Sequence, residues 1–212
     1  MGREELEVIK SGVVRRKTKR KIGLFIDATG LDRATRRLDR KIDLSKLVTG
    51  LSSGLQIEVA RYYTLIPYED DARQLSFLDA VERAGVEVVT KRLPPKGVKR
   101  QVSMDVHIAT DLLKFSNGNY AKVAQPQENL QMAANDSPIT LGKPSTQKSP
   151  GEIKRVSVIV CPSREISYAL YTAYELGTET VLADFGLYGS SDGWKGVDRW
   201  IDLSTSETIW RD

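Results

Sequence analysis

The 212-residue sequence has few of the side chains on which most metal sites and nucleophilic enzymes are built. It contains one cysteine, Cys161, and one histidine, His107. A single cysteine cannot form an internal disulfide, which is compatible with a reducing cytoplasm. A zinc site, or a Ser-His or Cys-His triad, is not expected either. Any bound metal should therefore be a hard cation held by oxygen ligands.

Long apolar runs are also absent from the sequence. No stretch approaches the roughly 20 residues of a membrane span, and the N-terminal sequence MGREELEVIK lacks the hydrophobic segment of a signal peptide. Hydrophobic residues make up 40% of the chain and charged residues 28%, as in ordinary soluble proteins. We expect one cytoplasmic domain with no membrane partner and with enough chain to bury a core.

Positive charge, by contrast, is concentrated near the N-terminus. The net charge is only +4, but the stretch from Ile9 to Lys41 holds twelve Lys and Arg against three Asp. Such a cluster attracts a polyanion, and nucleic acid is the commonest polyanion in a cytoplasm. A solvated basic arm followed by one charged helix face explains the same run. The charge therefore narrows the class of partner without naming it.

The most informative stretch is Lys21–Leu31, KIGLFIDATGL. Its apolar run from Ile22 to Ile26 is too short for a helix and predicts a buried strand. Asp27 follows at the carboxyl end of that strand, where open α/β sheets bind their ligands. The alternative is that Asp27 caps the turn that comes next.

Strand and helix patterns alternate along the rest of the chain. A β-branched and aromatic segment at 57–66 and apolar runs at 86–89, 156–161 and 180–183 predict four more strands, with a short edge strand at 200–203. Apolar residues at helical spacing predict helices at 42–51, 75–84, 103–115 and 166–176. The alternation predicts an α/β fold with a doubly wound, mainly parallel five-stranded sheet and helices on both faces.

Composition suggests the boundaries of the domain. We expect a basic N-terminal arm at 1–20, a single domain at 21–203 and a C-terminal tail at 204–212. The stretch from about 116 to 152 is rich in Gln, Asn, Ser, Pro and Lys and has almost no large apolar residues. Because a loop of this length is unusual in a compact domain, it is predicted to be a flexible polar insertion.

Two more carboxylates belong to the predicted helix at 103–115. Asp105 falls in its first turn, next to the strand ends, which makes it a candidate metal ligand. Asp111 lies six residues later, about 9 Å along the helix axis and some 120° around it, so the two cannot easily bind one metal directly. Asp111 is better placed to orient a water or a basic side chain, or to cover a buried edge.

The ordered set of segments resembles the NYN branch of the PIN-like nuclease superfamily. Phe25–Gly30 matches the first three residues of the family's F-I-D-x-x-N and has Gly where Asn is expected. Asp105 and Asp111 match the two carboxylates of the next motif, although its Lys-Gly is absent. The third motif, S-G-D-x-D-F, falls on 161–166, with Ser163 at its first acidic position and Glu165 at its second. The end of the predicted helix at 175–177 and the closing stretch at 198–203 are also similar to the corresponding parts of the family.

This resemblance implies a nuclease that hydrolyses phosphodiester bonds, of RNA more than DNA, with one or two Mg²⁺ or Mn²⁺ ions. The implied metal ligands are Asp27, Asp105 and Glu165, with Asp111 as a fourth catalytic residue behind them. Thr29 and Ser163 offer hydroxyl contacts. The side chains expected to hold the nucleic-acid backbone, RNA or a single strand, are Arg33, Arg36, Arg37, Lys96, Lys99 and Arg100.

The departures at Gly30 and Ser163 support an alternative function. A protein that has lost two polar groups of the site can be a catalytically weakened relative that binds nucleic acid or regulates a partner. A phosphatase with Asp27 as nucleophile is a third class, but no second Asp follows two residues later. Trp194, Trp200 and Trp210 form a packing patch, a homodimer surface or a stacking platform for bases, and the sequence does not choose among these.

Overall fold

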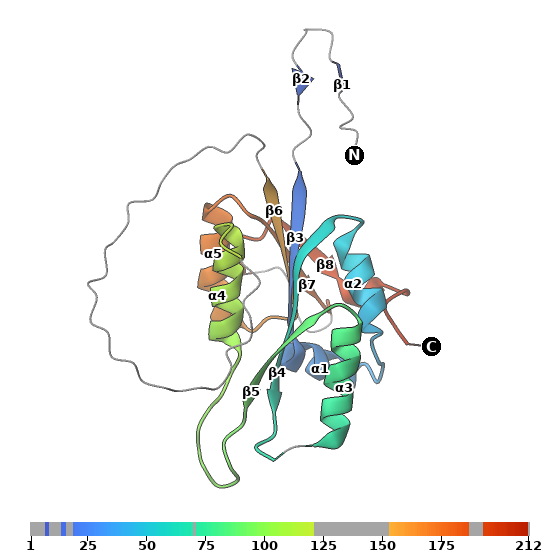
Figure 1. The fold of residues 1–212 in the computed structure, drawn as a ribbon, viewed down its shortest axis with the longest axis vertical. Helices are drawn as coiled ribbons and strands as arrows, with labels where there is room; N and C mark the ends of the chain where they lie inside the picture. Colours follow the sequence, from blue (N-terminus) through green and yellow to red (C-terminus); the bar gives the residue numbers. More distant parts are fainter. Residues whose placement is uncertain are drawn as a thin grey trace, which may run out of the picture.

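A six-stranded parallel sheet forms the centre of the protein (Figure 1). The structure is a computed structural model that describes residues 7–8, 14–15, 19–69, 71–120, 153–186 and 193–211. Within the predicted N-terminal arm it describes two short antiparallel strands, β1 (Glu7–Val8) and β2 (Val14–Arg15). Of the predicted polar insertion only residues 116–120 are among the described residues.

The strands of the large sheet lie in the order β5-β4-β3-β6-β7-β8, and each neighbouring pair is parallel. The predicted doubly wound α/β fold is thereby confirmed, with six strands in the sheet in place of five. The sixth is the short edge strand expected near residue 200. The strand bounds are β3 (Arg20–Asp27), β4 (Gln56–Ile66), β5 (Glu87–Arg92), β6 (Lys154–Val160), β7 (Glu179–Asp184) and β8 (Arg199–Asp202).

Helices cover both faces of this sheet (Figure 1). One face carries α1 (Ala28–Arg37), α2 (Leu44–Ser52) and α3 (Ala72–Arg83). The other carries α4 (Asp105–Ser116) and α5 (Ser167–Glu175), the latter preceded by the 3₁₀ turn η1 (Arg164–Ile166). A second 3₁₀ turn, η2 (Leu203–Thr205), follows β8. None of the helices in the described part of the chain is long and apolar enough to cross a membrane.

The central strand β3 shows how the two helical layers are packed. Ile22, Leu24 and Ile26 belong to the apolar core on the side of α1, α2 and α3, whereas Phe25 belongs to the core beneath α4 and α5. Alternate residues of a strand face opposite sides of the sheet. Asp27 comes two residues after Phe25 and is therefore directed toward the layer that contains α4.

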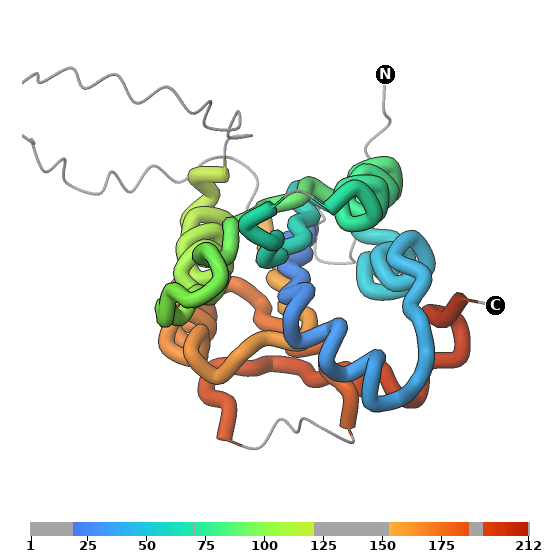
Figure 2. Tube along the Cα trace, turned by 90° about the horizontal axis from the view of Figure 1, so that it is seen from below, coloured from blue at the N-terminus to red at the C-terminus, as the bar shows by residue number. Residues whose placement is uncertain are grey.

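The order of the strands creates a topological switch point beside Asp27, and open α/β sheets bind their ligands in a crevice at such points. The chain builds β3, β4 and β5 toward one edge of the sheet and then returns to place β6 on the other side of β3. The connections after β3 and β6 leave in opposite directions, toward α1 and toward α5, so the switch point, where a crevice is expected, lies between the carboxyl ends of these two strands. Figure 2 views the molecule from this end, where β3 passes into α1.

Helix α1 was not predicted from the sequence. Its buried residues are only Ala28, Leu31 and Ala34, and most of its other positions are polar or basic. The apolar stripe of α1 is therefore narrow, and its helical periodicity is hard to recognise in the sequence among the many arginines. The helix is nevertheless anchored because Asp27 caps its first turn and Leu31 packs into the core.

Residues of the predicted C-terminal tail pack onto the domain. Ile209 and Trp210 are buried, and Trp210 forms an isolated β-bridge with Ile42. The Trp210 indole N–H donates to the carbonyl of Ser206 at 2.7 Å, and its ring lies 5.8 Å from that of Phe185. Of the alternatives for the tryptophans, Trp210 is thus part of the packing within the chain.

We expect Trp210→Ala to lower the free energy of unfolding by about 3–5 kcal/mol, because it removes a large buried side chain and leaves a cavity. Urea denaturation followed by circular dichroism measures this. Tyr168→Ala is the matched control, since Tyr168 is an aromatic residue that is 81% exposed. Equal midpoints for the two variants would contradict the packing described here.

Candidate active site at the carboxyl end of the sheet

Asp27 lies at the predicted end of a strand and also has the capping role that the sequence offered as the alternative. It is the last residue of β3, and it is also the N-cap of α1. Its Oδ1 accepts hydrogen bonds from the backbone N–H groups of Thr29 at 3.0 Å and Gly30 at 3.4 Å. The residue is 6% exposed, so the carboxylate has little contact with water.

The surroundings of Asp27 make its negative charge unfavourable. Burial raises the pKa of the carboxyl to about 6, and the charge of Asp105 adds to the rise. The N–H groups of Gly30 and Thr29 and the charge of Arg33 lower it. A divalent cation would offset the cost of ionising Asp27, because it interacts favourably with both carboxylates.

Asp105 is held in place by the loop that follows β6. It is the first residue of α4, and its Oδ1 accepts a hydrogen bond from the Ser163 hydroxyl at 2.5 Å. The Ser163 hydroxyl in turn accepts from the backbone N–H of Glu165 at 3.3 Å. A hydroxyl at position 163 donates to Asp105, whereas a carboxylate there would repel it.

The three predicted metal ligands are not brought together to the same extent. Asp27 and Asp105 interact electrostatically, whereas the Glu165 side chain is exposed. Within the described ranges, no three or more His, Cys, Asp or Glu side chains form a group that could hold a metal ion. The pair Asp27 and Asp105 still fits Mg²⁺, which proteins often bind through one or two carboxylates, with waters and substrate phosphates as the other ligands.

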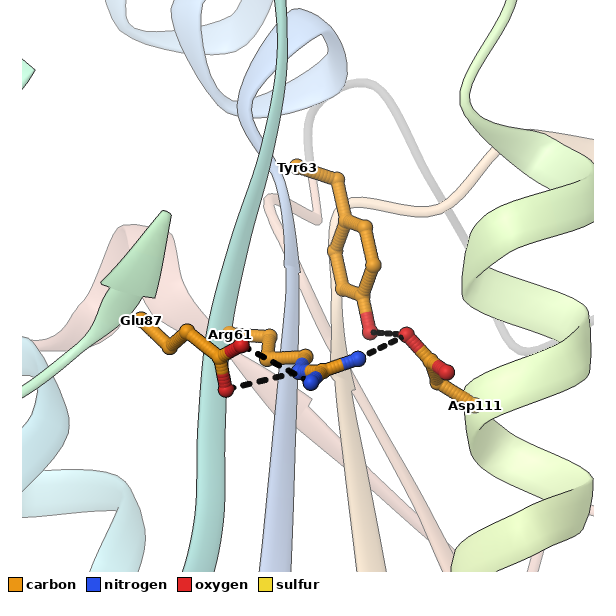
Figure 3. A network of polar contacts seen from close by, with 4 residues as sticks. All are labelled: Arg61, Tyr63, Glu87 and Asp111. Atoms are coloured by element: carbon orange, nitrogen blue, oxygen red, sulfur yellow. Dashed lines mark hydrogen bonds and ion pairs between the residues drawn. The ribbon is translucent and has the colours of Figure 1, made fainter. Parts of the chain in front are cut away.

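Asp111 lies in a buried polar network instead (Figure 3). Its Oδ2 accepts from an Arg61 Nη at 2.5 Å and from the Tyr63 hydroxyl at 3.0 Å. Arg61 also donates to both oxygens of Glu87, at 3.0 and 2.8 Å. Orienting a basic side chain was one of the roles expected for Asp111. Through this network α4 is fixed to β4, and the position of Asp105 at the start of α4 is fixed with it.

All six basic residues predicted to contact a nucleic-acid backbone are exposed. Arg33, Arg36 and Arg37 lie on α1, and Arg33 is close enough to lower the pKa of Asp27. Arg36 forms an exposed ion pair with Asp32 at 3.0 Å. The other three, Lys96, Lys99 and Arg100, lie in the loop that joins β5 to α4. Both segments adjoin the carboxyl end of the sheet.

Comparison with protein families identifies the chain. Residues 21–124, which include β3 to α4, match the family described as NYN domain. This protein is a member of the NYN domain family. NYN domains belong to the PIN-like nuclease superfamily, whose members generally use divalent metals. No curated protein matches the sequence at a significant level.

The fold of this NYN protein is also found in a solved structure. A protein of unknown function from Vibrio parahaemolyticus is similar with a TM-score of 0.66 and 11% sequence identity. The similarity covers 93% of the present chain and 99% of the other. At this identity the likeness concerns the fold alone.

Two further carboxylates of the NYN protein lie at the ends of strands. Neither was predicted from the sequence to be a site residue. Asp184 ends β7 and Asp202 ends β8. Burial raises the pKa of Asp184, and the nearby charge of Asp202 adds to the rise. The signal that marks Asp27, an apolar strand that ends on a carboxylate, is equally present at Asp184.

Cys161 is part of the core and is not a nucleophile. It is buried after β6, and burial and the charge of Asp184 hold the pKa of its thiol well above the usual value. The thiol therefore stays protonated at neutral pH, whereas nucleophilic cysteines need the thiolate.

A close backbone approach accounts for the glycine at position 30, where the family motif has Asn. A Cβ on Gly30 would lie 2.0 Å from the carbonyl oxygen of Cys161. The first turn of α1 thus packs directly against the backbone after β6, and no side chain fits between them.

We expect Gly30→Ala to lower the free energy of unfolding by about 1–3 kcal/mol, because α1 or the backbone at Cys161 must move. Gly50→Ala is the matched control, since Gly50 also lies in a helix, α2, and a Cβ there would meet nothing within 4 Å. Gly50→Ala should stabilise the protein by about 0.5–1 kcal/mol. Chemical denaturation of both variants measures the difference, and equal effects would refute the close approach.

The raised pKa of Asp27 predicts that Asp27→Asn stabilises the metal-free protein. Asn keeps the oxygen that caps α1 but carries no charge. Since the folded-state pKa of about 6 exceeds the ordinary value of 3.8, the wild type loses stability as pH rises from about 4 through 6, and then stays lower. The advantage of Asp27→Asn should thus be only about 0.5 kcal/mol at pH 4 and reach about 3 kcal/mol at pH 7.

Denaturation in EDTA across this pH range measures that advantage. Asp71→Asn is the control, because Asp71 caps α3 in the same way but is exposed. A variant Asp27→Asn that is no more stable than wild type at pH 7 would show that Asp27 is not desolvated.

Proposed function

We propose that this NYN protein is a metal-dependent nuclease that hydrolyses phosphodiester bonds, with RNA preferred to DNA. The observation that carries the proposal is the pairing of Asp27, buried and with its pKa raised, with Asp105 at the crevice between β3 and β6. Two carboxylates in this position form a site that gains from a cation and from the polyanion that the cation can bind.

Mg²⁺ or Mn²⁺ would be held by Asp27 and Asp105, and we retain Glu165, on the neighbouring turn η1, as a third ligand in the substrate complex. The bound cation would supply Lewis-acid activation of a water and charge neutralisation at the scissile phosphate. The protein's own residues position these groups: Ser163 fixes the Asp105 carboxylate, and the network of Arg61 and Asp111 fixes α4.

The basic residues beside the crevice supply the binding surface for the strand. Arg33, on the first turns of α1, is near enough to Asp27 to contact a phosphate that approaches the carboxylate pair. Lys96, Lys99 and Arg100, from the loop before α4, would contact phosphates farther along the strand. Backbone contacts of this kind bind single-stranded nucleic acid in a salt-dependent manner, without reading its sequence. Such a substrate fits a cytoplasmic enzyme.

A second function is favoured by the loop after β6. Ser163 stands where the family motif has a carboxylate, and its hydroxyl occupies Oδ1 of Asp105. Because the Glu165 side chain is also exposed, only two of the three predicted carboxylate ligands, Asp27 and Asp105, are paired at the site. A protein that binds nucleic acid and cleaves it slowly or not at all has the same architecture.

Cleavage assays on labelled single-stranded RNA and DNA, with Mn²⁺, Mg²⁺ or EDTA, distinguish these functions. We expect RNA cleavage only with a divalent metal, and a loss of at least about 100-fold in rate for Asp27→Asn and for Asp105→Asn. Both variants should still bind the RNA in EDTA. Asp71→Asn, at an exposed helix cap, should cleave like the wild type.

The outcomes of this experiment are separable. Binding without cleavage under every metal condition would reject the nuclease and favour the binding protein. Cleavage that survives in both Asp27→Asn and Asp105→Asn would place the chemistry elsewhere. The absence of both binding and cleavage would reject nucleic acid as the ligand.

A further inference from the structure

A cavity of about 480 Å³ lies on the opposite side of α1 from the α4 layer. It is bordered by α1, by the connection from α1 to α2, by α3 and by Arg211 near the C-terminus. Figure 2 shows α1, α2 and α3 around this side of the molecule. The cavity is not used by the chemistry proposed for Asp27 and Asp105, and its volume can accommodate a single nucleotide.

The interior of the cavity is aromatic and apolar. Tyr62 and Phe77 line it together with Leu31. The two rings lie 6.1 Å apart in an edge-to-face arrangement at 67°. Tyr62 is buried, whereas Phe77 is 43% exposed, so part of a phenyl ring remains open to a planar ligand. Exposed aromatic rings of this kind stack on nucleobases without requiring a particular base.

The rim of the cavity carries an excess of positive charge. Its cations are Arg36, Arg40, Lys41 and Arg211, and its carboxylates are Asp32 and Asp39. Arg36 is paired with Asp32, and Arg40 lies over the Trp210 ring at 4.0 Å. In the part of the chain that the structure describes, the side chains of Lys41 and Arg211 have neither a hydrogen bond nor an ion pair, so both are available to an anion.

The cavity adjoins the candidate active site through two elements. Tyr62 pairs in register with Ile26, the residue before Asp27, on the neighbouring strand. Helix α1 begins directly after Asp27 and presents Leu31 and Thr35 to the cavity. Burial raises the pKa of Tyr62, and the charges of Asp32 and Asp27 add to the rise, which places this phenol within electrostatic reach of the Asp27 carboxylate.

We propose that this cavity binds one nucleotide of the same strand whose phosphodiester lies at Asp27 and Asp105, with the base against Phe77 and the phosphate at Lys41 and Arg211. The inference rests on the proposed function and extends it to a subsite for the substrate. This binding mode uses both parts of the cavity lining. The base would stack on the open phenyl ring in the apolar interior, and the phosphate would lie beside the two available cations of the rim. The strand would then pass over the first turns of α1.

The test is binding of a fluorescein-labelled 12-nucleotide single-stranded RNA, measured by anisotropy in EDTA so that no cleavage occurs. Phe77→Ala should weaken binding at least about fivefold, because base stacking is lost. Phe77→Leu, which keeps an apolar side chain in the cavity, should weaken it similarly even if the alanine variant is unstable. Leu75→Ala is the control on the same helix, exposed and outside this cavity, and should change affinity less than twofold.

Salt dependence tests the phosphate contacts separately. The double variant Lys41→Gln with Arg211→Gln should reduce the slope of log Kd against log salt concentration by about 0.7, the value for the one phosphate that the protein no longer neutralises. Arg83→Gln with Lys114→Gln removes two exposed charges outside the cavity and should leave the slope unchanged.

Each outcome bears on the proposal. A wild-type protein that cleaves RNA while the Phe77 variants bind as tightly as wild type overturns the subsite and leaves the nuclease intact. Saturable binding of 5′-UMP or 5′-AMP that is lost in Phe77→Ala, with unchanged RNA affinity, would assign the cavity to a free nucleotide and overturn the strand assignment. Absence of both RNA binding and cleavage in the wild type overturns the proposed function and the subsite together.

Discussion

The carboxylate of Asp27 connects the folding of the domain to the chemistry that we propose for it. The same Oδ1 that satisfies the N–H groups at the start of α1 belongs to the residue that carries the charge of the site. A helix cap stabilises a fold whether it is charged or neutral, but the cost of burying a charge is borne by the folded state. The domain therefore keeps at its centre a group whose ionised form is unfavourable until a cation approaches. Such conflicts between stability and local electrostatics are typical of functional sites.

A second buried group keeps the opposing carboxylate in position. Arg61 is almost completely buried, and its guanidinium is shared between Glu87 on β5 and Asp111 on α4 (Figure 3). Removing Asp111 would leave the buried guanidinium with only the partly exposed Glu87 as its ionic partner, and weakening a buried ion pair in this way costs more than an exposed ion pair contributes. The network therefore fixes α4 against β4 rather than adding general stability. Asp105 lies at the beginning of that helix and benefits from its fixed position.

Local patterns predicted the parts of the fold that local interactions determine. The apolar runs that became β3, β4, β6 and β7, and the parallel order implied by the intervening helices, were evident from the sequence. So was the convergence of Asp27 and Asp105 at one end of the sheet. Helix α1 was missed because its buried stripe consists mainly of alanines among basic residues. Asp184 was missed although the same strand-end pattern marks it.

Other features depend on contacts between distant parts of the chain, which spacing in the sequence cannot reveal. The partner of Asp111 is Arg61, fifty residues away. The need for glycine at position 30 comes from the carbonyl of Cys161, on a strand connection that the chain forms much later. In the same way, the role of Ser163 becomes clear only when its hydroxyl is seen to donate to Asp105. Both departures from the family motif, Gly30 and Ser163, therefore have a local structural explanation in the neighbouring backbone and charge.

The strand order also bears on where this domain begins and ends as a folding unit. The family match stops at residue 124, before β6, yet β6 is the strand that pairs with β3 along one whole side. A fragment limited to the matched residues would expose the backbone N–H and C=O groups of the central strand as an open edge, flanked by the apolar residues that β6 normally covers. Open, apolar edges of this kind pair with other chains and aggregate. The second half of the chain thus protects the strand that ends in Asp27.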